Sequence, residues 1–280
     1  MAYAFNDNKS KADVYTKAEI DTQFSQIEKR LWPQAYAVLD ENTGLLTFFR
    51  DTENKWADKQ RIGGKVYFTN FEQANPSFGW LDFAYRRNIK RVDMQNSISV
   101  RTLASFFENC ENITTVSLDK LDSSMAVSAN RMFGGCGSIT TLDLSYLNLQ
   151  LVQDMSLMFG GCLSLKNIKL GNTFSITMNV RNMSGMFIRC YSLETVDISQ
   201  GINTYFVTDT NQMFYECRKL KTIYVNEDIV NLDNVTNSNS MFYGCVELVG
   251  GKGTTFDNTK INKEYARVDN PPDEPGYFSK

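Results

Sequence analysis

The sequence contains no histidine among its 280 residues. Histidine is the commonest general acid or base near neutral pH and the usual partner of cysteine at zinc sites, so both kinds of site lack their usual residue. No serine, threonine or cysteine stands in a nucleophile motif either. We therefore predict no catalytic residue, no metal site and no cofactor, and we expect that the chain is not an enzyme.

The chain also lacks an excess of charge and a long apolar run. Its 29 basic and 32 acidic residues give a net charge of −3, which provides no basic surface for nucleic acid. No apolar stretch approaches the length of a transmembrane helix, and the polar residues 1–14 do not resemble a secretory signal peptide. We therefore expect no nucleic-acid binding, no membrane insertion, and synthesis in a reducing cytoplasm.

The six cysteines all fall at one phase of a repeat, at successive separations of 26, 26, 28, 27 and 28 residues. A period in this range indicates repeats that stack on their neighbours. Neighbouring packed elements lie farther apart than a disulfide tolerates, so we interpret the cysteines as buried reduced thiols rather than as disulfides or metal ligands. They are Cys110, Cys136, Cys162, Cys190, Cys217 and Cys245.

Each repeat shows two spacings of apolar residues. Around the cysteine they recur at steps of three and four, which is typical of a helix or of tight helical turns; beyond it they alternate, which is typical of a strand. These patterns predict an α/β solenoid, leucine-rich-repeat-like, in which about six units of 26 to 28 residues, each a short helix or turn plus one strand, form a parallel sheet. We expect the solenoid at residues 97–253, a β-hairpin cap within 34–96 and a C-terminal cap at 254–280.

A helix is predicted at residues 16–33. Thr16 and Glu19 form a capping box at its start, and four apolar residues with a coiled-coil spacing follow: Ile20, Phe24, Ile27 and Leu31. So short a helix is marginal alone, so we favour oligomerisation through this seam, as a homotrimer or another small bundle. Packing of the helix on its own repeats remains the alternative.

Two parts of the sequence resemble known families. Met158 to Leu170, MFGGCLSLKNIKL, resembles the repeat of BspA-like leucine-rich repeat surface proteins. Residues 35–49, AYAVLDENTGLLTFF, and 265–278, YARVDNPPDEPGYF, are similar to that family's leading hairpin and ending. This resemblance implies adhesion or ligand display. Val14 to Asp21, VYTKAEID, is similar to a short motif near the start of tailed-phage fibre and receptor-binding proteins.

The second resemblance, together with the missing export signal, favours a virion component. We predict a tail or capsid fibre that attaches to other virion proteins through residues 1–33, with residues 1–15 as the attachment or flexible segment, and that presents its repeats to a glycan or protein on the host surface. The alternative is a bacterial BspA-like cell-surface adhesin whose export signal is missing.

The outward positions of the predicted strands are the candidate binding residues. They carry short hydroxyls, amides and charged groups that could form hydrogen bonds with a glycan. The alternative is a solvated sheet face with threonines that favour strand geometry. The candidates are Thr115, Ser117, Thr141, Asp143, Lys169, Thr195, Asp197 and Tyr224.

Overall fold

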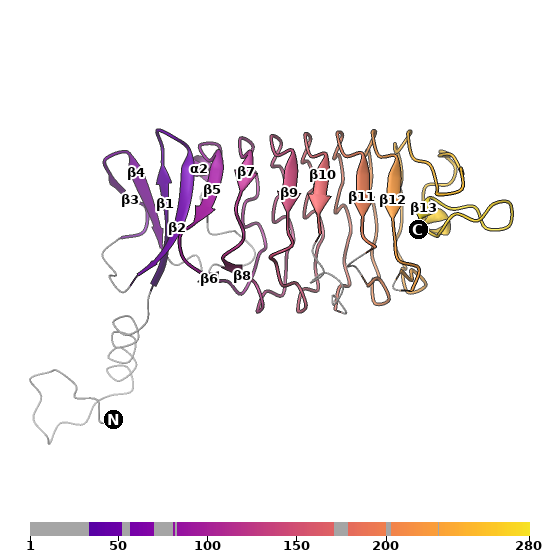
Figure 1. The fold of residues 1–280 in the computed structure, drawn as a ribbon, viewed down its shortest axis with the longest axis horizontal. Helices are drawn as coiled ribbons and strands as arrows, with labels where there is room; N and C mark the ends of the chain where they lie inside the picture. Colours follow the sequence, from indigo (N-terminus) through magenta and orange to yellow (C-terminus); the bar gives the residue numbers. More distant parts are fainter. Residues whose placement is uncertain are drawn as a thin grey trace, which may run out of the picture.

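A computed structural model describes residues 34–51, 57–69, 81, 83–170, 179–199, 203–228 and 230–280. Figure 1 shows the strands of successive repeats side by side, with a larger group of strands at the N-terminal end and a small closing segment at the C-terminal end. The predicted helix at 16–33 lies outside the described residues.

The N-terminal strands form one six-stranded mixed sheet in the order β3-β4-β1-β2-β5-β7. Its antiparallel part contains β1 (Gln34–Asp40), β2 (Leu45–Asp51), β3 (Gln60–Ile62) and β4 (Lys65–Thr69). β1 and β2 pair as the predicted hairpin. β5 (Arg91–Met94) pairs in parallel with β2 and with β7 (Thr115–Val116), the first strand of the repeats, so this sheet joins the cap to the repeats.

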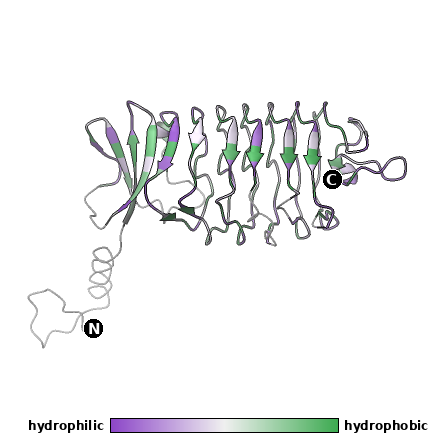
Figure 2. Ribbon diagram, viewed as in Figure 1, coloured by the Kyte–Doolittle hydropathy of each residue, from purple (hydrophilic) through white to green (hydrophobic). Residues whose placement is uncertain are grey.

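The strands of the repeats are two or three residues long and pair in parallel. β9 (Thr141–Asp143) pairs with β10 (Asn167–Lys169). β12 (Thr222–Tyr224) lies between β11 (Thr195–Asp197) and the C-terminal β13 (Phe278–Ser279). A separate pair contains β6 (Ile98–Ser99) and β8 (Leu121–Asp122). Figure 2 shows hydrophilic and hydrophobic residues mixed along the strands of the repeats, as expected where one side faces the core and the other faces solvent.

The predicted α/β solenoid is wrong. The described residues contain almost only strands and turns: their helices are α2 (Phe83–Arg86), which precedes the repeats, and the short 3₁₀ helix η3 (Lys263–Tyr265) in the C-terminal segment. The single continuous parallel sheet is also absent from the described residues, where the strands divide into a mixed sheet of six and smaller sheets of two, three and two strands.

The reason lies in the segment of eight residues before each cysteine, which we call the turn segment. Its alternate N–H groups donate to carbonyls of the following repeat: Arg131 N to Ser156 O at 3.0 Å and Gly135 N to Gly160 O at 2.7 Å, for example. Arg131 and Gly135 also have φ angles of 53° and 76°. An α-helix needs its N–H groups for its own i−4 carbonyls and excludes left-handed residues, so this segment forms successive tight turns.

The core contains columns of identical side chains. The six cysteines are free and buried, which confirms the predicted column of reduced thiols, and the Met-Phe pairs are buried beside them. Each of the last five thiols donates to the carbonyl of the buried phenylalanine of the preceding repeat, as Cys162 Sγ does to Phe133 O at 3.1 Å. The phenylalanine rings stack at 5.3 to 6.2 Å between centroids. Burial raises the pKa of Cys162 to about 12.

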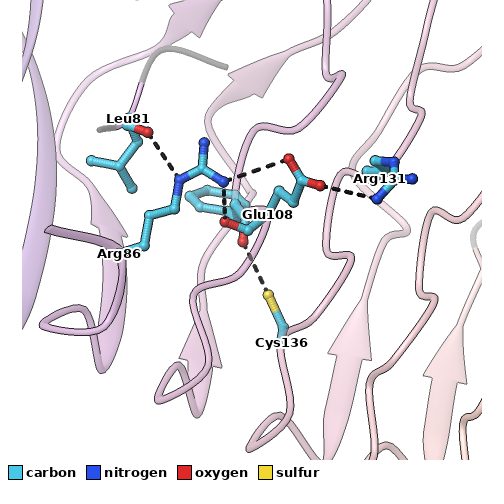
Figure 3. Close-up of polar contacts among 6 residues, drawn as sticks. Leu81, Arg86, Glu108, Arg131 and Cys136 are labelled. Atoms are coloured by element: carbon cyan, nitrogen blue, oxygen red, sulfur yellow. Dashed lines mark hydrogen bonds and ion pairs between the residues drawn. The ribbon is translucent and has the colours of Figure 1, made fainter. Parts of the chain in front are cut away.

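The hydrogen bonds between turn segments all have the same direction, from the N–H groups of one repeat to the carbonyls of the next. The two ends of the stack therefore need different partners. The first repeat has no predecessor to donate to its carbonyls, and Arg86, 7% exposed, takes that place: its Nη1 donates to Glu108 O at 2.8 Å and its Nε donates to Leu81 O at 2.9 Å (Figure 3). At the last repeat, Ser240 N donates to the side chain of Asn262 at 3.0 Å. Phe242 N, two residues later, donates to the backbone carbonyl of Ile261 at 2.9 Å. A side chain thus replaces a missing backbone group at each end, and at the last repeat a carbonyl of the C-terminal segment also does so.

Candidate binding surface

The outward side chains of the repeat strands form one surface, which we call the strand face. Its first row contains Thr115, Thr141, Asn167, Thr195 and Thr222, and its second row contains Ser117, Asp143, Lys169, Asp197 and Tyr224. Of the eight candidate residues, seven are exposed and Ser117 is half-buried. The alternation of the strands therefore places all eight toward solvent, as predicted, while their binding role remains a prediction.

Strand register brings members of each row together. Thr141 lies opposite Asn167 and Asp143 opposite Lys169 in the β9–β10 pair. The Lys169 ammonium contacts the Asp143 carboxylate at 2.9 Å. In the β11–β12 pair, Asp197 lies opposite Tyr224. Paired parallel strands lie about 4.8 Å apart, so the hydrogen-bonding groups of each row are close neighbours within the β9–β10 and β11–β12 pairs.

The two aspartates of the face also have a structural role. Asp143 Oδ1 accepts hydrogen bonds from the backbone N and the hydroxyl of Ser145, and Asp197 makes the same pair of contacts with Ser199. Burial acts to raise the pKa of Asp143, but the hydrogen bonds from Ser145 and Lys169 outweigh it, and the pKa is lowered. Both carboxylates close the turn that follows their strand, so their substitution would disturb the turn as well as any ligand contact.

A hollow of about 560 Å³ lies at the N-terminal end of the strand face. Thr115, Ser117 and Asp143 line it, together with Arg91 and Tyr146. The sequence prediction missed the last two residues. Tyr146, 58% exposed, follows the strand rather than belonging to it, and the signal that could have indicated it is an aromatic residue within a polar turn.

A second hollow, of about 750 Å³, lies at the other end, and Tyr224 is the candidate residue that lines it. Its remaining walls come from residues 249–252 and 268–280, where Lys252 and Asn270 contribute polar groups. Sequence reasoning missed these residues, because a periodic pattern carries no information on how a non-repeating tail folds back.

Other candidate groups do not form a site. The seam residues Ile20, Phe24, Ile27 and Leu31 lie outside the described residues. Within the described ranges, no group of three or more His, Cys, Asp or Glu residues has a geometry that could hold a metal ion. The helices of the same ranges include none with the length and apolar character needed to cross a membrane.

Comparison with known proteins gave two family matches. Residues 76–206 match the model of the BspA type leucine rich repeat region, which occurs in 6 copies, and residues 172–255 match a model described as Mycoplasma protein of unknown function, DUF285. No curated protein and no solved structure matched the chain. BspA-type repeats are typical of surface-associated, adhesion-type proteins.

Proposed function

Because the chain belongs to the BspA-like leucine-rich repeat family, we propose that it is an adhesion-type surface protein that binds its ligand on the strand face. The observation that carries this proposal is the array of exposed hydroxyl, amide and charged groups on β7 and β9 to β12. The buried columns behind these strands hold the array rigid, so ligand contacts require little ordering of the protein.

More finely, we propose that the protein is a fibre of a phage virion. Residues 1–33 would attach it to other virion proteins and associate three copies, which would present three strand faces to the host. Several weak contacts made at once raise the overall affinity well above that of one contact. The motif at residues 14–21 supports this proposal.

The family match favours a second candidate, a bacterial cell-surface adhesin. Gold-labelled antibodies against the chain discriminate between the two locations: a fibre labels purified virus particles, whereas an adhesin labels the bacterial envelope. Light scattering on the full chain tests the assembly. A fibre predicts a trimer that Phe24→Asp with Ile27→Asp converts to a monomer, whereas the control Gln26→Glu remains a trimer. A wild-type monomer would contradict the fibre.

The strand face is tested by obstruction rather than by removal of its aspartates. Thr141→Arg and Thr195→Arg each place a long side chain on an exposed threonine position and leave both turn-closing carboxylates intact. The measurement is binding of the labelled full chain to host cells. We expect both variants to lose binding and Thr236→Arg, at an exposed threonine outside the face, to retain it. Equal binding by all three variants would exclude the strand face.

A further inference from the structure

The hollow at the C-terminal end of the strand face, which we call the C-terminal groove, is more elaborately built than the rest of the face. Its floor is β12 with β13, and its walls are residues 249–252 and 268–274. Its volume of about 750 Å³ lies within the usual range of small-molecule sites. The tail that closes the stack therefore also encloses a space beside Tyr224.

The walls are fixed by one buried carboxylate. Asp269, 2% exposed, accepts hydrogen bonds from Lys252 N at 2.8 Å, Thr254 N at 3.0 Å, Thr254 Oγ1 at 2.5 Å and Gly276 N at 3.2 Å. These bonds join one wall to the other. The close approach leaves no room for a side chain at Gly250, where a Cβ would lie 2.1 Å from Gly276 O. The groove is thus formed before any ligand arrives.

Two side chains in the groove are available for a ligand. The Tyr224 ring is 40% exposed and stands on the floor. Ser279 is 6% exposed and lines the same space, and its hydroxyl makes no hydrogen bond to another of the described residues. The hydroxyl oxygen is still reached by solvent, because Thr210 Oγ1 is the buried side-chain oxygen without a partner among the described residues. A ligand hydroxyl can therefore take the place of water at Ser279.

The charges around the groove are of both signs and mostly engaged. The Lys280 ammonium pairs with the Glu227 carboxylate, and Lys252 Nζ donates to Asn270 Oδ1 at 2.7 Å. No excess positive charge is left for a phosphate or sulfate. The outer edge of β13 is not open to an added peptide strand either, since Phe278 N donates to Arg267 O and Phe278 O accepts from Asp269 N, both at 3.0 Å.

A ligand that matches this set of groups has an apolar face for an aromatic ring and several neutral hydrogen-bonding groups at its edge. Sugar rings have this character: their C–H groups cover one face and their hydroxyls both donate and accept. Resting on the proposed adhesion function and narrowing its ligand class, we propose that the C-terminal groove binds a neutral saccharide unit, with Tyr224 beneath the ring and Ser279 bonded to a hydroxyl.

The test uses the folded full chain on an array of neutral hexose and N-acetylhexosamine oligosaccharides, with sialylated and sulfated ones as the charged arm. The array oligosaccharide with the strongest signal is then titrated by calorimetry. We expect Tyr224→Ala to weaken binding about tenfold or more and Ser279→Ala about three- to tenfold. The matched control is Tyr243→Ala at a turn segment, where the tyrosine is 44% exposed, and this variant should bind as wild type. Thermal unfolding confirms that each variant is folded.

Three outcomes would overturn the saccharide proposal: no neutral oligosaccharide bound by wild type at millimolar concentration, preference for the charged arm, or equal loss of binding in Tyr224→Ala and Tyr243→Ala. These outcomes do not decide the adhesion function. If the chain binds host cells and Thr141→Arg abolishes that binding, the strand face is still supported even when no oligosaccharide binds. If Thr141→Arg also leaves cell binding unchanged, the strand-face proposal is rejected by its own test.

Discussion

Replacing Arg86 with methionine tests whether a side chain substitutes for a missing repeat. In the interior, each turn segment donates its N–H groups to the next, as Asn109 N does to Gly134 O at 2.7 Å. Glu108 O, at the equivalent position of the first repeat, receives Arg86 Nη1 at 2.8 Å instead. The Arg86→Met side chain retains most of the apolar stem but has no donor, so the carbonyls of Leu81 and Glu108 lose their charged partner.

The magnitude follows from the contacts. A hydrogen bond to a charged group contributes roughly 1.5–3 kcal/mol, and removal of one member of a buried ion pair costs about 3–5 kcal/mol. Two such bonds are lost here, together with a 3.5 Å contact between Arg86 and the Glu108 carboxylate, which Arg131 still pairs at 3.3 Å. We therefore expect the free energy of unfolding to fall by about 3–5 kcal/mol.

Urea unfolding of the full chain measures this effect. All three tryptophans precede residue 81 in the sequence, so their fluorescence follows the N-terminal end, while circular dichroism follows the whole chain. The stability of a repeat protein is approximately the sum of contributions from each repeat and from each interface between neighbours, so the loss of Arg86 should destabilise mainly the N-terminal end. The fluorescence transition should therefore move to lower urea more than the circular dichroism transition does.

Two further variants separate the explanations. Arg131→Gln removes the other, half-exposed partner of Glu108 and touches no end carbonyl, so it should cost at most about 1 kcal/mol. Arg86→Lys keeps the charge but lacks the planar guanidinium that reaches two carbonyls, so its free energy of unfolding should lie between those of wild type and Arg86→Met. If lysine restores full stability, or if Arg86→Met costs no more than Arg131→Gln, the reasoning fails.

Three other predictions concern the core and the turns. Between pH 9 and 12 the thiols of the unfolded chain lose protons that the buried thiols of the folded chain keep. The free energy of unfolding should therefore fall as pH rises, by about 1.4 kcal/mol per pH unit for each thiol. Urea titrations of Cys162→Ala at several pH values should show a fall per pH unit that is smaller by the contribution of one thiol. Thr210→Val, which removes a buried hydroxyl with no partner, should raise the unfolding free energy by about 1–3 kcal/mol, whereas Thr204→Val, which removes two hydrogen bonds, should lower it; the same sign for both would contradict this. Gly135→Ala, whose Cβ would lie 2.4 Å from Asn109 Oδ1, should lower the melting temperature more than Gly63→Ala, where the same left-handed strain meets open space.

The sequence was sufficient for the positions of the core and the short strands. Buried cysteines and Met-Phe pairs recur at one phase, and alternation identified strands such as Thr141–Asp143. For the segment around each cysteine the sequence left a short helix and a tight turn as alternatives, because both share apolar steps of three and four, and the helical alternative was wrong. Left-handed geometry would have revealed the turns, but Arg131, Leu157 and Gln212 adopt it without being glycine, and no local residue preference indicates that they do.

The candidate surface divides in the same way. The outward direction of Asp143 and Tyr224 follows from strand periodicity alone. The walls around Tyr224 could not be predicted, because they depend on Asp269 bonding to a loop 15 to 17 residues earlier in the chain. A contact that occurs once leaves no periodic trace, so sequence reasoning finds the repeated part of a surface and misses its ends.

The single direction of the turn segments limits how such a chain can change its length. The cap that carries Arg86 supplies donors, and the cap that carries Asn262 supplies an acceptor. Neither cap could serve at the opposite terminus. Interior units, by contrast, present the same groups as their neighbours on both sides. Duplication or deletion of a whole unit between the caps would therefore conserve every terminal partner. The length of the stack can thus change in steps of one repeat, in evolution or by protein engineering, without a new cap.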